Sequence, residues 1–296
     1  MSRPVCLITG GNAGIGYAAA VQLARAGAEV VIAARSPERG VAAVASARRE
    51  SGSDAVSLVQ MDLSSRPSVL AGVDAFRGAG HDRLDVLIHN AADFDVSRTQ
   101  PTDSADGVET VWATNHVGPV LLTQQLEPEL LRARQGRVIT VSSQGLVLHP
   151  RLRVRLDDPE FRRGGFRVDR AYYQSKLAQV MYTLWLAERH RDTAVTANCV
   201  RVTNVEIDLT RYPGLSPLMR ALYSVKSLLS ISPSEMAEVY TWLALSPEAT
   251  DVSGGYFDHK RRRVGAGRYA ENPTNVRAVM EMTERYVPGA LGALAA

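Results

Sequence analysis

An apolar, strand-like run at Pro4–Thr9 leads straight into a glycine-rich turn, and an alanine-rich helical stretch, Ile15–Ala26, follows it. The turn has the spacing Gly-x3-Gly-x-Gly, formed by Gly10, Gly14 and Gly16. A helix N-terminus presents unpaired backbone N–H groups to a pyrophosphate, which a Cβ atom would hold off. We therefore expect Gly10 to permit the turn, Gly14 the close approach and Gly16 tight helix–strand packing. A glycine-rich turn alone is also compatible with a plain turn, but its place between the first strand and the first helix favours a dinucleotide site.

The alternation of strand-like and helix-like segments continues along the chain. Further strands are expected at Glu29–Ala34, Ala55–Gln60, Leu84–His89, Arg137–Ser142, Thr193–Val202 and Gly254–Asp258. Helices are expected at Pro37–Glu50, Val69–Arg77, Ala105–Arg134 (one or two), Tyr172–His190, Leu215–Leu229 and Ser234–Leu245. Because the strands are largely apolar, this rhythm predicts an α/β fold, a Rossmann-like doubly wound parallel sheet of about seven strands with helices on both faces. Residues 1–296 are expected to form a single domain with a frayed tail at 289–296.

Composition excludes several classes of protein. The 296 residues are 45% apolar and 22% charged, with a net charge of +3, so we expect neither a nucleic-acid face nor a need for disulfides. Cys6 and Cys199 lie in apolar runs and are expected to be reduced core thiols, and the six histidines lack metal-ligand spacing. With no signal peptide or long apolar segment, we expect a cytoplasmic enzyme without a metal or a membrane partner.

The residues that end the second strand would contact the adenosine ribose of a bound dinucleotide, so they bear on the choice between NAD and NADP(H). An acidic side chain there would bind the 2′-hydroxyl and favour NAD. This chain has Ala33-Ala34-Arg35 instead, and Arg39 follows shortly after. A guanidinium can pair a 2′-phosphate and stack on adenine, so NADP(H) is preferred and NAD stays possible. The alternative is that Arg35 is a solvated loop charge.

A phenol and an ammonium stand four residues apart at Tyr172 and Lys176, near the start of a predicted helix. That spacing puts both side chains on one face of the helix. A neighbouring cation favours phenolate and makes tyrosine a more effective acid–base group near neutral pH. The alternative is a solvated lysine beside a packing tyrosine. Tyr256 and Lys260 share the spacing, but on a predicted strand they would lie roughly 13 Å apart.

Two further polar positions fall where a site is expected. Ser142 and Ser143 end a predicted strand, and strand carboxyl ends line the ligand crevice of open parallel sheets. A hydroxyl there can bind a substrate oxygen, although serine also commonly caps helices and loops. Asn115 interrupts a long helical pattern, where it can bridge backbone groups or hold a water.

Together these residues resemble the short-chain dehydrogenase/reductase family over about residues 4–285. The family's order and spacing occur in Thr9-Gly10-x3-Gly14-x-Gly16, Asp62-Leu63, Asn90-Ala91-Ala92, Asn115, Ser143 and Tyr172-x3-Lys176. The chain looks most like the retinol-dehydrogenase-like branch, on the evidence of Tyr172–Gln179, Asn115–Gly118 and Ser253–Phe257.

The resemblance implies a role for each matched residue. The catalytic set would be Asn115, Ser143, Tyr172 and Lys176. Tyr172 would donate and accept the proton, Lys176 would bind the nicotinamide ribose, Ser143 would orient the carbonyl, and Asn115 would hold a water on the proton relay. Asp62 would contact adenine, and Asn90 would support the cofactor and the sheet. The implied cofactor-binding set is Thr9, Gly10, Asn12, Gly14, Ile15, Gly16, Arg35, Asp62, Leu63, Asn90, Tyr172, Lys176 and Thr203.

The chain departs from the family pattern at two places. Ala92 replaces a usual glycine, which is a small steric change. The usual Pro-Gly and the threonine that contacts the nicotinamide carboxamide would fall at Val202-Thr203 and Ile207. The nicotinamide wall is therefore altered, and Thr203 or Asn204 is the candidate substitute.

Two segments of the chain bear on the class of substrate. Seven arginines lie between Ser143 and Tyr172; they are either solvated charges paired with Asp157, Asp158, Glu160 and Asp169, or a mouth for an anionic substrate. The amphipathic stretch Leu215–Leu229, within a segment at 212–232, is expected to be a substrate lid, a core helix or a membrane-docking helix. The lid alternative implies a lipophilic or polycyclic substrate.

The resulting hypothesis is a carbonyl reductase that uses NADPH on a small-molecule carbonyl or alcohol. Alcohol oxidation, a redox-neutral epimerisation and a non-catalytic dinucleotide sensor remain alternatives. In this family the helices near Ala113–Arg134 and Tyr172–His190 commonly build a dimer interface. A homodimer is therefore possible, and Met181 and Trp185 belong either to that interface or to the core.

Overall fold

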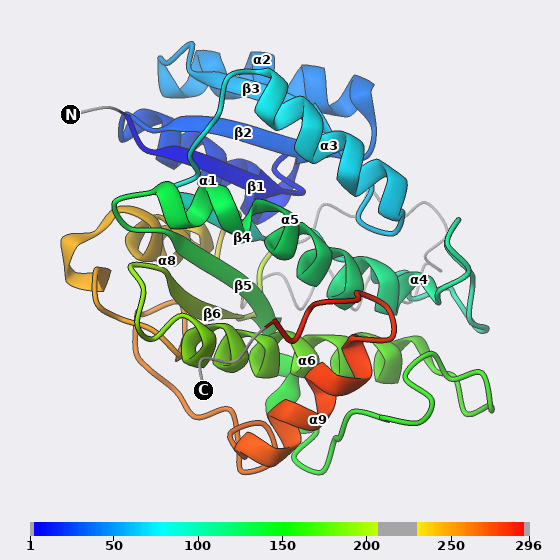
Figure 1. Ribbon diagram of the computed structural model, residues 1–296. Coiled ribbons are helices and arrows are strands. Elements are labelled where there is room, and N and C mark those ends of the chain that lie inside the picture. Colours follow the sequence, from blue (N-terminus) through cyan, green and yellow to red (C-terminus); the bar gives the residue numbers. More distant parts are fainter. Residues whose placement is uncertain (1–2, 207–229, 293–296) are drawn as a thin grey trace.

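Every strand of the described residues joins one parallel sheet (Figure 1). The computed structural model describes residues 3–206 and 230–292. From edge to edge the strands are β3 (Val56–Gln60), β2 (Glu29–Ala34), β1 (Val5–Thr9), β4 (Val86–His89), β5 (Arg137–Ser143), β6 (Thr196–Val202) and β7 (Gly255–Phe257). The strand order reverses between β1 and β4, so the loops after these two strands diverge and open a crevice at the carboxyl edge of the sheet.

Helices cover both faces of this sheet. One face carries α1 (Gly14–Arg25), α2 (Pro37–Ser51) and α8 (Pro233–Leu245). The other face carries α3 (Arg66–Gly78), α5 (Gly118–Arg132) and α6 (Val168–Arg189), and α9 (Pro273–Thr283) lies outside α6 (Figure 1). Short helical pieces complete the described chain: α4 (Thr110–Trp112), η1 (Ala113–Val117), η2 (Gln144–Leu148) and η4 (Pro247–Ala249).

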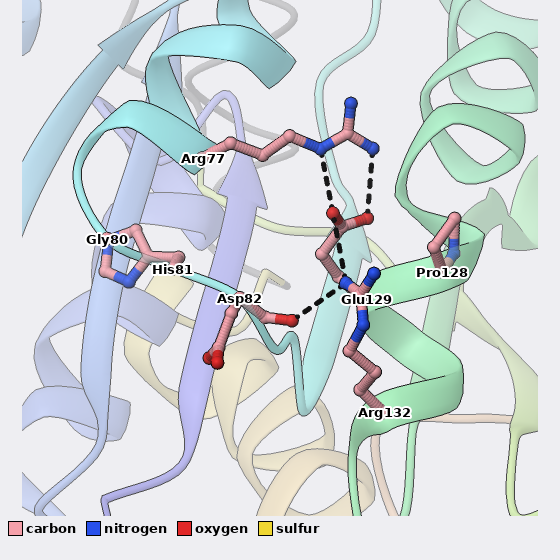
Figure 2. Close-up of a pocket in the computed structure, with 7 residues that line it drawn as sticks. All are labelled: Arg77, Gly80, His81, Asp82, Pro128, Glu129 and Arg132. Atoms are coloured by element: carbon pink, nitrogen blue, oxygen red, sulfur yellow. Dashed lines mark hydrogen bonds and ion pairs between the residues drawn. The ribbon is translucent and has the colours of Figure 1, made fainter.

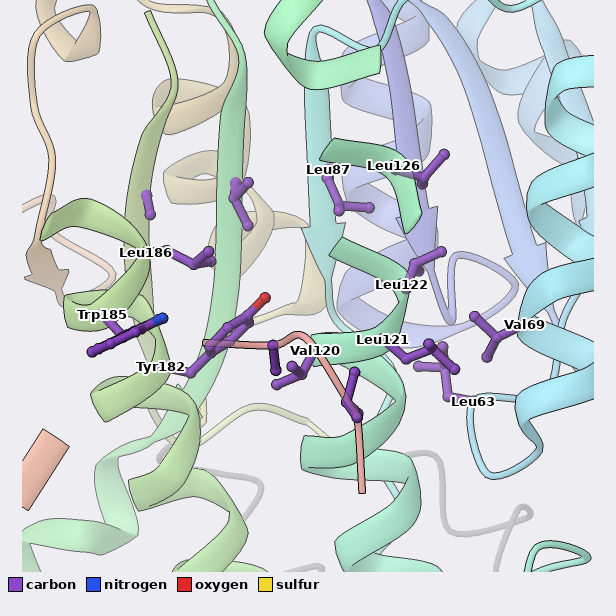
Figure 3. Close-up of a cluster of buried hydrophobic side chains, with 14 of the residues drawn as sticks. Leu63, Val69, Leu87, Val120, Leu121, Leu122, Leu126, Tyr182, Trp185 and Leu186 are labelled. Atoms are coloured by element: carbon purple, nitrogen blue, oxygen red, sulfur yellow. The ribbon is translucent and has the colours of Figure 1, made fainter. Parts of the chain in front are cut away.

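Two apolar clusters hold the three layers together, because successive residues of each buried strand point to opposite faces. Leu7 belongs to the cluster under α3, α5 and α6, and its neighbours Cys6 and Ile8 belong to the cluster under α1, α2 and α8. Figure 3 shows Leu122 of α5 and Tyr182 of α6 within the first cluster. Each fully buried leucine contributes about 1.5–3 kcal/mol of transfer free energy, so burial on both faces fixes the sheet.

The predicted doubly wound sheet is confirmed, with strand ends within about three residues of the expected ones. The helix α9 was not predicted, although Asn272 precedes Pro273 and accepts hydrogen bonds from the N–H groups of Thr274 and Asn275. An asparagine cap followed by proline at the first helical position is a recognised start signal.

Of the helical stretch expected at Ala105–Arg134, residues 110–132 are helical and form one helix with a π-helical turn in it. The structure runs from α4 through η1 into α5 without a loop. Pro119 lacks the N–H that would bond the carbonyl oxygen of Asn115 in a regular helix. The wider turn at η1 accommodates that missing bond and sets Asn115 inside the fold, where it is 1% exposed.

Some predictions fall on residues outside the described part. These are the lid helix Leu215–Leu229 and Ile207. The described end of the lid segment holds Ile231, which bridges Val205 in parallel. The predicted frayed tail at 289–296 is described up to residue 292, and the N–H of Leu291 donates to the Glu284 carboxylate over 2.8 Å. Within 3–206 and 230–292, no helix combines the length and apolarity needed to cross a membrane.

The outer side of α6 is covered by the chain's own C-terminal region. Met280 and Val287 are fully buried in the cluster that contains Met181 and Trp185. Met181 is 0% and Trp185 6% exposed, so of the two readings left open for these residues, the core is confirmed. A homodimer stays a prediction.

Two buried histidines predict an acid-sensitive core. The hydroxyls of Thr123 and Thr283 donate to the carbonyls of Pro119 and Val279, so they accept from the Nε2–H groups of His89 and His116, over 2.7 and 2.8 Å. Burial lowers the pKa of both imidazoles to about 3. The unfolded chain, with imidazole pKa values near 6.5, therefore binds more protons below that pH, and stability falls as the pH falls.

Between pH 8 and pH 5.5 we expect each imidazole to lower the free energy of unfolding by about 1.4 kcal/mol, and the pair to lower it by about 3 kcal/mol. Urea unfolding at both pH values measures this loss. A double variant, His89→Gln with His116→Gln, should lose that share of the pH dependence, whereas His149→Gln, at a half-buried position, should retain it. An unchanged pH dependence in the double variant would contradict the assignment.

Candidate active site

The turn after β1 has the backbone that a phosphate cradle needs. Gly10 and Gly14 have φ angles of 66° and 58°, in the left-handed region where glycine is favoured. A Cβ on Gly16 would lie 2.3 Å from the Asn90 side-chain nitrogen and 2.6 Å from the Gly10 oxygen. The predicted close packing at Gly16 is therefore real, but its partners are the turn itself and the loop after β4.

Thr9 and Asn90 lock that turn to the neighbouring strand end. The Thr9 hydroxyl accepts hydrogen bonds from the N–H groups of Asn90 and Ala91, over 3.0 and 3.1 Å. The Asn90 amide donates to the Thr9 carbonyl over 3.0 Å and accepts from the Tyr240 hydroxyl over 3.3 Å. Asn90 thus supports the junction of β1 and β4, as expected. The contribution of Tyr240, from α8, was not anticipated, because no local signal relates it to Asn90.

The start of α1 is open to an anion. Its N-cap residue, Ala13, makes no side-chain cap, and the first turn carries no acidic residue. Asn12 and Ile15 are half-buried around this end, and Arg35 is exposed beyond the end of β2. Among the described residues Arg35 has no ion-pair partner, so its guanidinium remains available to a ligand. The open helix end, the left-handed glycines and this cation fit a phosphate-bearing dinucleotide.

Asp62 and Leu63 follow β3 on the same edge of the sheet. The Asp62 carboxylate accepts from the N–H and the hydroxyl of Ser64, over 2.9 and 2.7 Å, so it shapes the turn after β3. Leu63 is buried, and a Cβ on Gly118 would lie 2.2 Å from its carbonyl oxygen. Gly118 therefore allows the start of α5 to approach this turn closely.

Tyr172 and Lys176 share one face of α6, as their spacing predicts. The Lys176 ammonium lies 5.6 Å from the centroid of the Tyr172 ring and donates to the Val141 carbonyl of β5 over 3.0 Å. Lys176 is only 3% exposed, and burial lowers its pKa to about 8. An ammonium with that pKa remains mostly protonated at neutral pH, so a positive charge lies directly beneath the half-buried phenol.

The two serines at the end of β5 make different hydrogen bonds. Ser142 is 1% exposed, and its hydroxyl donates to the Lys176 carbonyl over 2.9 Å. Ser143 is half-buried, and its oxygen accepts from the N–H of Gly145 over 3.1 Å, which caps η2. Because that bond uses only a lone pair, the Ser143 proton can still be donated. Ser142 is a support for Lys176, and Ser143 is the serine at the crevice.

The side chain of Asn115 is fully engaged. It accepts from the N–H of Asp93 over 2.7 Å and donates to the Asp93 carbonyl and the Ser175 hydroxyl, over 3.1 and 3.0 Å. The bridging of backbone groups that the sequence indicates is therefore present. The backbone carbonyl of Asn115 receives no hydrogen bond from residue 119, because proline has no N–H.

Thr203 and the pair Tyr256 and Lys260 are the other residues that the sequence singled out. The Thr203 hydroxyl, after β6, is hydrogen-bonded to the side-chain oxygen of Gln144, next to Ser143. Tyr256 is 6% exposed in β7, and Lys260 is exposed beyond that strand. Tyr256 is therefore the packing residue that we predicted, with its hydroxyl 3.4 Å from the Ser143 carbonyl.

Four of the seven arginines between Ser143 and Tyr172 are paired with acids. Their partners include all four acids that the sequence offered, in the pairs Arg155–Asp158, Arg162–Glu160, Arg163–Asp157 and Arg167–Asp169. Ion pairs at the surface thus account for most of the positive charge between Ser143 and Tyr172. Arg153 instead lies over the Tyr269 ring, 5.6 Å from its centroid.

A surface pocket of about 470 Å³ lies elsewhere, between the end of α3 and α5 (Figure 2). Arg77 and Arg132 both contact Glu129 at this pocket, at 2.8 and 3.5 Å. The N–H of Leu84 donates to the Glu129 carbonyl just before β4 begins, so the pocket borders the amino edge of the sheet. None of the candidate residues lines it, and its two arginines already contact Glu129.

Comparison with known proteins gives three kinds of match. A family model described as short chain dehydrogenase matches residues 4–150. Dehydrogenase/reductase SDR family member 13 from Bos taurus is 39% identical over 257 residues, which cover 85% of this chain and 64% of that protein. Human retinol dehydrogenase 13 is 32% identical over 263 residues, which cover 88% of this chain and 77% of that protein. The match thus spans less than two thirds of the length of the bovine relative.

Solved structures match over most of the chain. An uncharacterized protein from Mycobacterium paratuberculosis superposes with a TM-score of 0.71 at 26% identity and covers 96% of this chain and 93% of its own. A short chain dehydrogenase from Shigella flexneri, solved as a complex with NADP, has a TM-score of 0.66 at 22% identity and covers 88% and 98%. The second match shows the shared fold.

Proposed function

Because this chain belongs to the short-chain dehydrogenase/reductase family, in its retinol-dehydrogenase-like branch, we propose that it is an NADP(H)-dependent oxidoreductase. The proposed reaction moves a hydride between nicotinamide and a carbonyl or alcohol carbon. The observation that carries the proposal is the buried Lys176 ammonium beneath the Tyr172 ring, where it donates to the Val141 carbonyl of β5, the strand that ends at Ser143. A buried charge is costly, so its presence beside a phenol supports a chemical role.

In the proposed reduction, Tyr172 donates its phenolic proton to the substrate oxygen, and Ser143 donates a hydrogen bond to the same oxygen. The Lys176 charge stabilises the phenolate that remains. When bound, nicotinamide supplies the hydride for reduction or accepts it for oxidation. Lys176 would also hold the nicotinamide ribose, the turn at Gly10–Gly16 the pyrophosphate, Asp62 the adenine, and Thr203 the carboxamide side.

The preference for NADP(H) rests on Arg35. No acid follows β2 directly, and the nearby Glu38 carboxylate accepts from the Ser36 hydroxyl over 2.8 Å. A 2′-phosphate would find an exposed guanidinium at this position, whereas the 2′-hydroxyl of NADH would find no carboxylate. The NADP complex of the Shigella protein with the same fold is consistent with this preference.

Replacing Arg35 with alanine should raise the Kd for NADPH about 10- to 100-fold, because a hydrogen bond to a charged group contributes about 1.5–3 kcal/mol. The Kd for NADH should change little. Fluorescence titration of both cofactors measures the two constants. Arg49→Ala, at the far end of α2, is the matched control. Equal losses for NADPH and NADH would contradict the 2′-phosphate role.

The proposed substrate is lipophilic. Val147 and Leu148 belong to η2, which follows Ser143 directly, and their side chains are 60% and 80% exposed, so the chain leaves apolar groups in water close to Ser143 in sequence. Apolar walls with a few polar groups are typical of small-molecule sites. A cytoplasmic location stays a prediction; Cys6 and Cys199 are buried free thiols.

A panel of apolar aldehydes and ketones tests the proposal. We expect absorbance-detected oxidation of NADPH with at least one member, faster than with NADH. Turnover of an alcohol with NADP⁺ alone would favour oxidation, and isomerisation without net cofactor use would favour an epimerase. Tight NADPH binding without turnover of any compound would favour a sensor.

A further inference from the structure

The loop after β4 places an aromatic ring against the proposed acid. The Phe94 and Tyr172 ring centroids are 4.3 Å apart with an interplanar angle of 32°, and both side chains are half-buried. A contact at this distance restricts how far the Tyr172 ring can turn or tilt. Phe94 belongs to none of the sequence motifs discussed above.

The backbone that carries Phe94 is held from two directions. Asn115 bonds both the N–H and the carbonyl of the preceding residue, Asp93, over 2.7 and 3.1 Å. The Asp93 carboxylate also accepts from Arg98 over 2.6 Å, with both side chains mostly buried. Phe94 therefore projects from a fixed point and not from a freely moving loop.

The same Asn115 reaches the backbone of Tyr172 through one more residue. Its amide donates to the Ser175 hydroxyl over 3.0 Å, and that hydroxyl donates to the Tyr172 carbonyl over 2.7 Å. A serine bond to a carbonyl three residues earlier is a common local feature of helices and alone says little. Here Ser175 is 0% exposed and its lone pair is taken by Asn115, so the bond belongs to a connected network.

We propose that Phe94 and Ser175 are positioning residues that hold Tyr172 by its ring and by its backbone, with Asn115 joining the two. This inference rests on the proposed function. The first turn of α6 has no side-chain cap at Arg167, so the helix end that carries Tyr172 receives this support from outside. Proton transfer depends on placement, and an error of 1 Å can cost about 100-fold in rate.

Two variants separate positioning from general stability. Phe94→Leu and Ser175→Ala should each lower kcat about tenfold or more, while the Kd for NADPH changes little and both chains remain folded under the assay conditions. Phe94→Tyr, which keeps the ring, should restore the rate. Phe257→Leu and Ser51→Ala are the matched controls, because Phe257 packs on Trp242 and Ser51 makes the same kind of local bond at the end of α2. Wild-type kcat in both Phe94→Leu and Ser175→Ala would overturn the proposal.

A measurement without turnover distinguishes this inference from the proposed function. In the full chain with ¹³C-labelled tyrosine rings, the Tyr172 signal is assigned by its loss in Tyr172→Phe. We expect Phe94→Leu to shift this signal by removing the neighbouring ring current, and Ser175→Ala to shift or broaden it. A Tyr172 signal that is unmoved in both variants overturns the positioning role of Phe94 and Ser175, even if the enzyme is active. Shifted signals in a chain that reduces no carbonyl compound would instead refute the proposed function and support the positioning of Tyr172 by Phe94 and Ser175.

Discussion

Replacing Tyr172 with phenylalanine is expected to lower kcat/KM for carbonyl reduction by about 100- to 10,000-fold, the usual contribution of a positioned acid–base group. Phenylalanine keeps the ring that packs on Phe94 but has no proton to donate. Because the proposed cofactor contacts lie mostly on the loops after β1 to β4, the Kd for NADPH should stay within about threefold.

Tyr173→Phe is the matched control for this substitution. Tyr173 is the next residue of the same helix, and its ring packs against His149 at 4.5 Å. Steady-state kinetics of both variants with the same carbonyl compound give the comparison. A Tyr172→Phe enzyme that keeps more than a tenth of the parent activity would refute the assignment of the acid.

Lys176→Met should produce the second large loss, about 100-fold or more at neutral pH. Methionine occupies a similar volume without a charge, so the phenolate of Tyr172 loses the cation that stabilises it. In the oxidation direction, where phenolate is the base, the acid limb of the kcat/KM profile should move to higher pH.

The control for this variant is Lys260→Met, an exposed lysine at the same spacing from Tyr256. Within residues 3–206 and 230–292 the Lys176 ammonium bonds the Val141 carbonyl and pairs with no carboxylate, so removing its charge leaves no partner charge buried there. We therefore expect the Lys176→Met chain to remain folded, and urea unfolding checks this. An unshifted pH profile in a folded variant would show that Lys176 does not act on the phenol.

The fold was predictable because its signals are local. The apolar runs at Val5–Thr9 and Glu29–Ala34 and the glycine turn between strand and helix need only a few adjacent residues to be recognised. The spacing of Tyr172 and Lys176 predicted their shared face for the same reason, since α-helical geometry fixes it. The helix α9 also has a local start signal, the cap Asn272 followed by Pro273.

The hydrogen bonds that support the site join residues that are far apart in the sequence. Tyr240 is 150 residues from Asn90, and Asn115 is 60 residues from Ser175. No periodicity or spacing relates such pairs, because only the folding of the chain brings them together. The sequence likewise indicated that Asn115 bridges backbone groups but could not identify Asp93 and Ser175 as its partners.

The most direct test of the proposed chemistry follows the hydride itself. NADPH carrying deuterium at both C4 positions of the nicotinamide is incubated with the preferred carbonyl compound, and the product is analysed by mass spectrometry. With the parent chain we expect an alcohol that carries one deuterium on its carbinol carbon, and with Tyr172→Phe almost none over the same time. A product without deuterium, or equal deuterium transfer by both chains, would contradict hydride transfer assisted by the Tyr172 phenol.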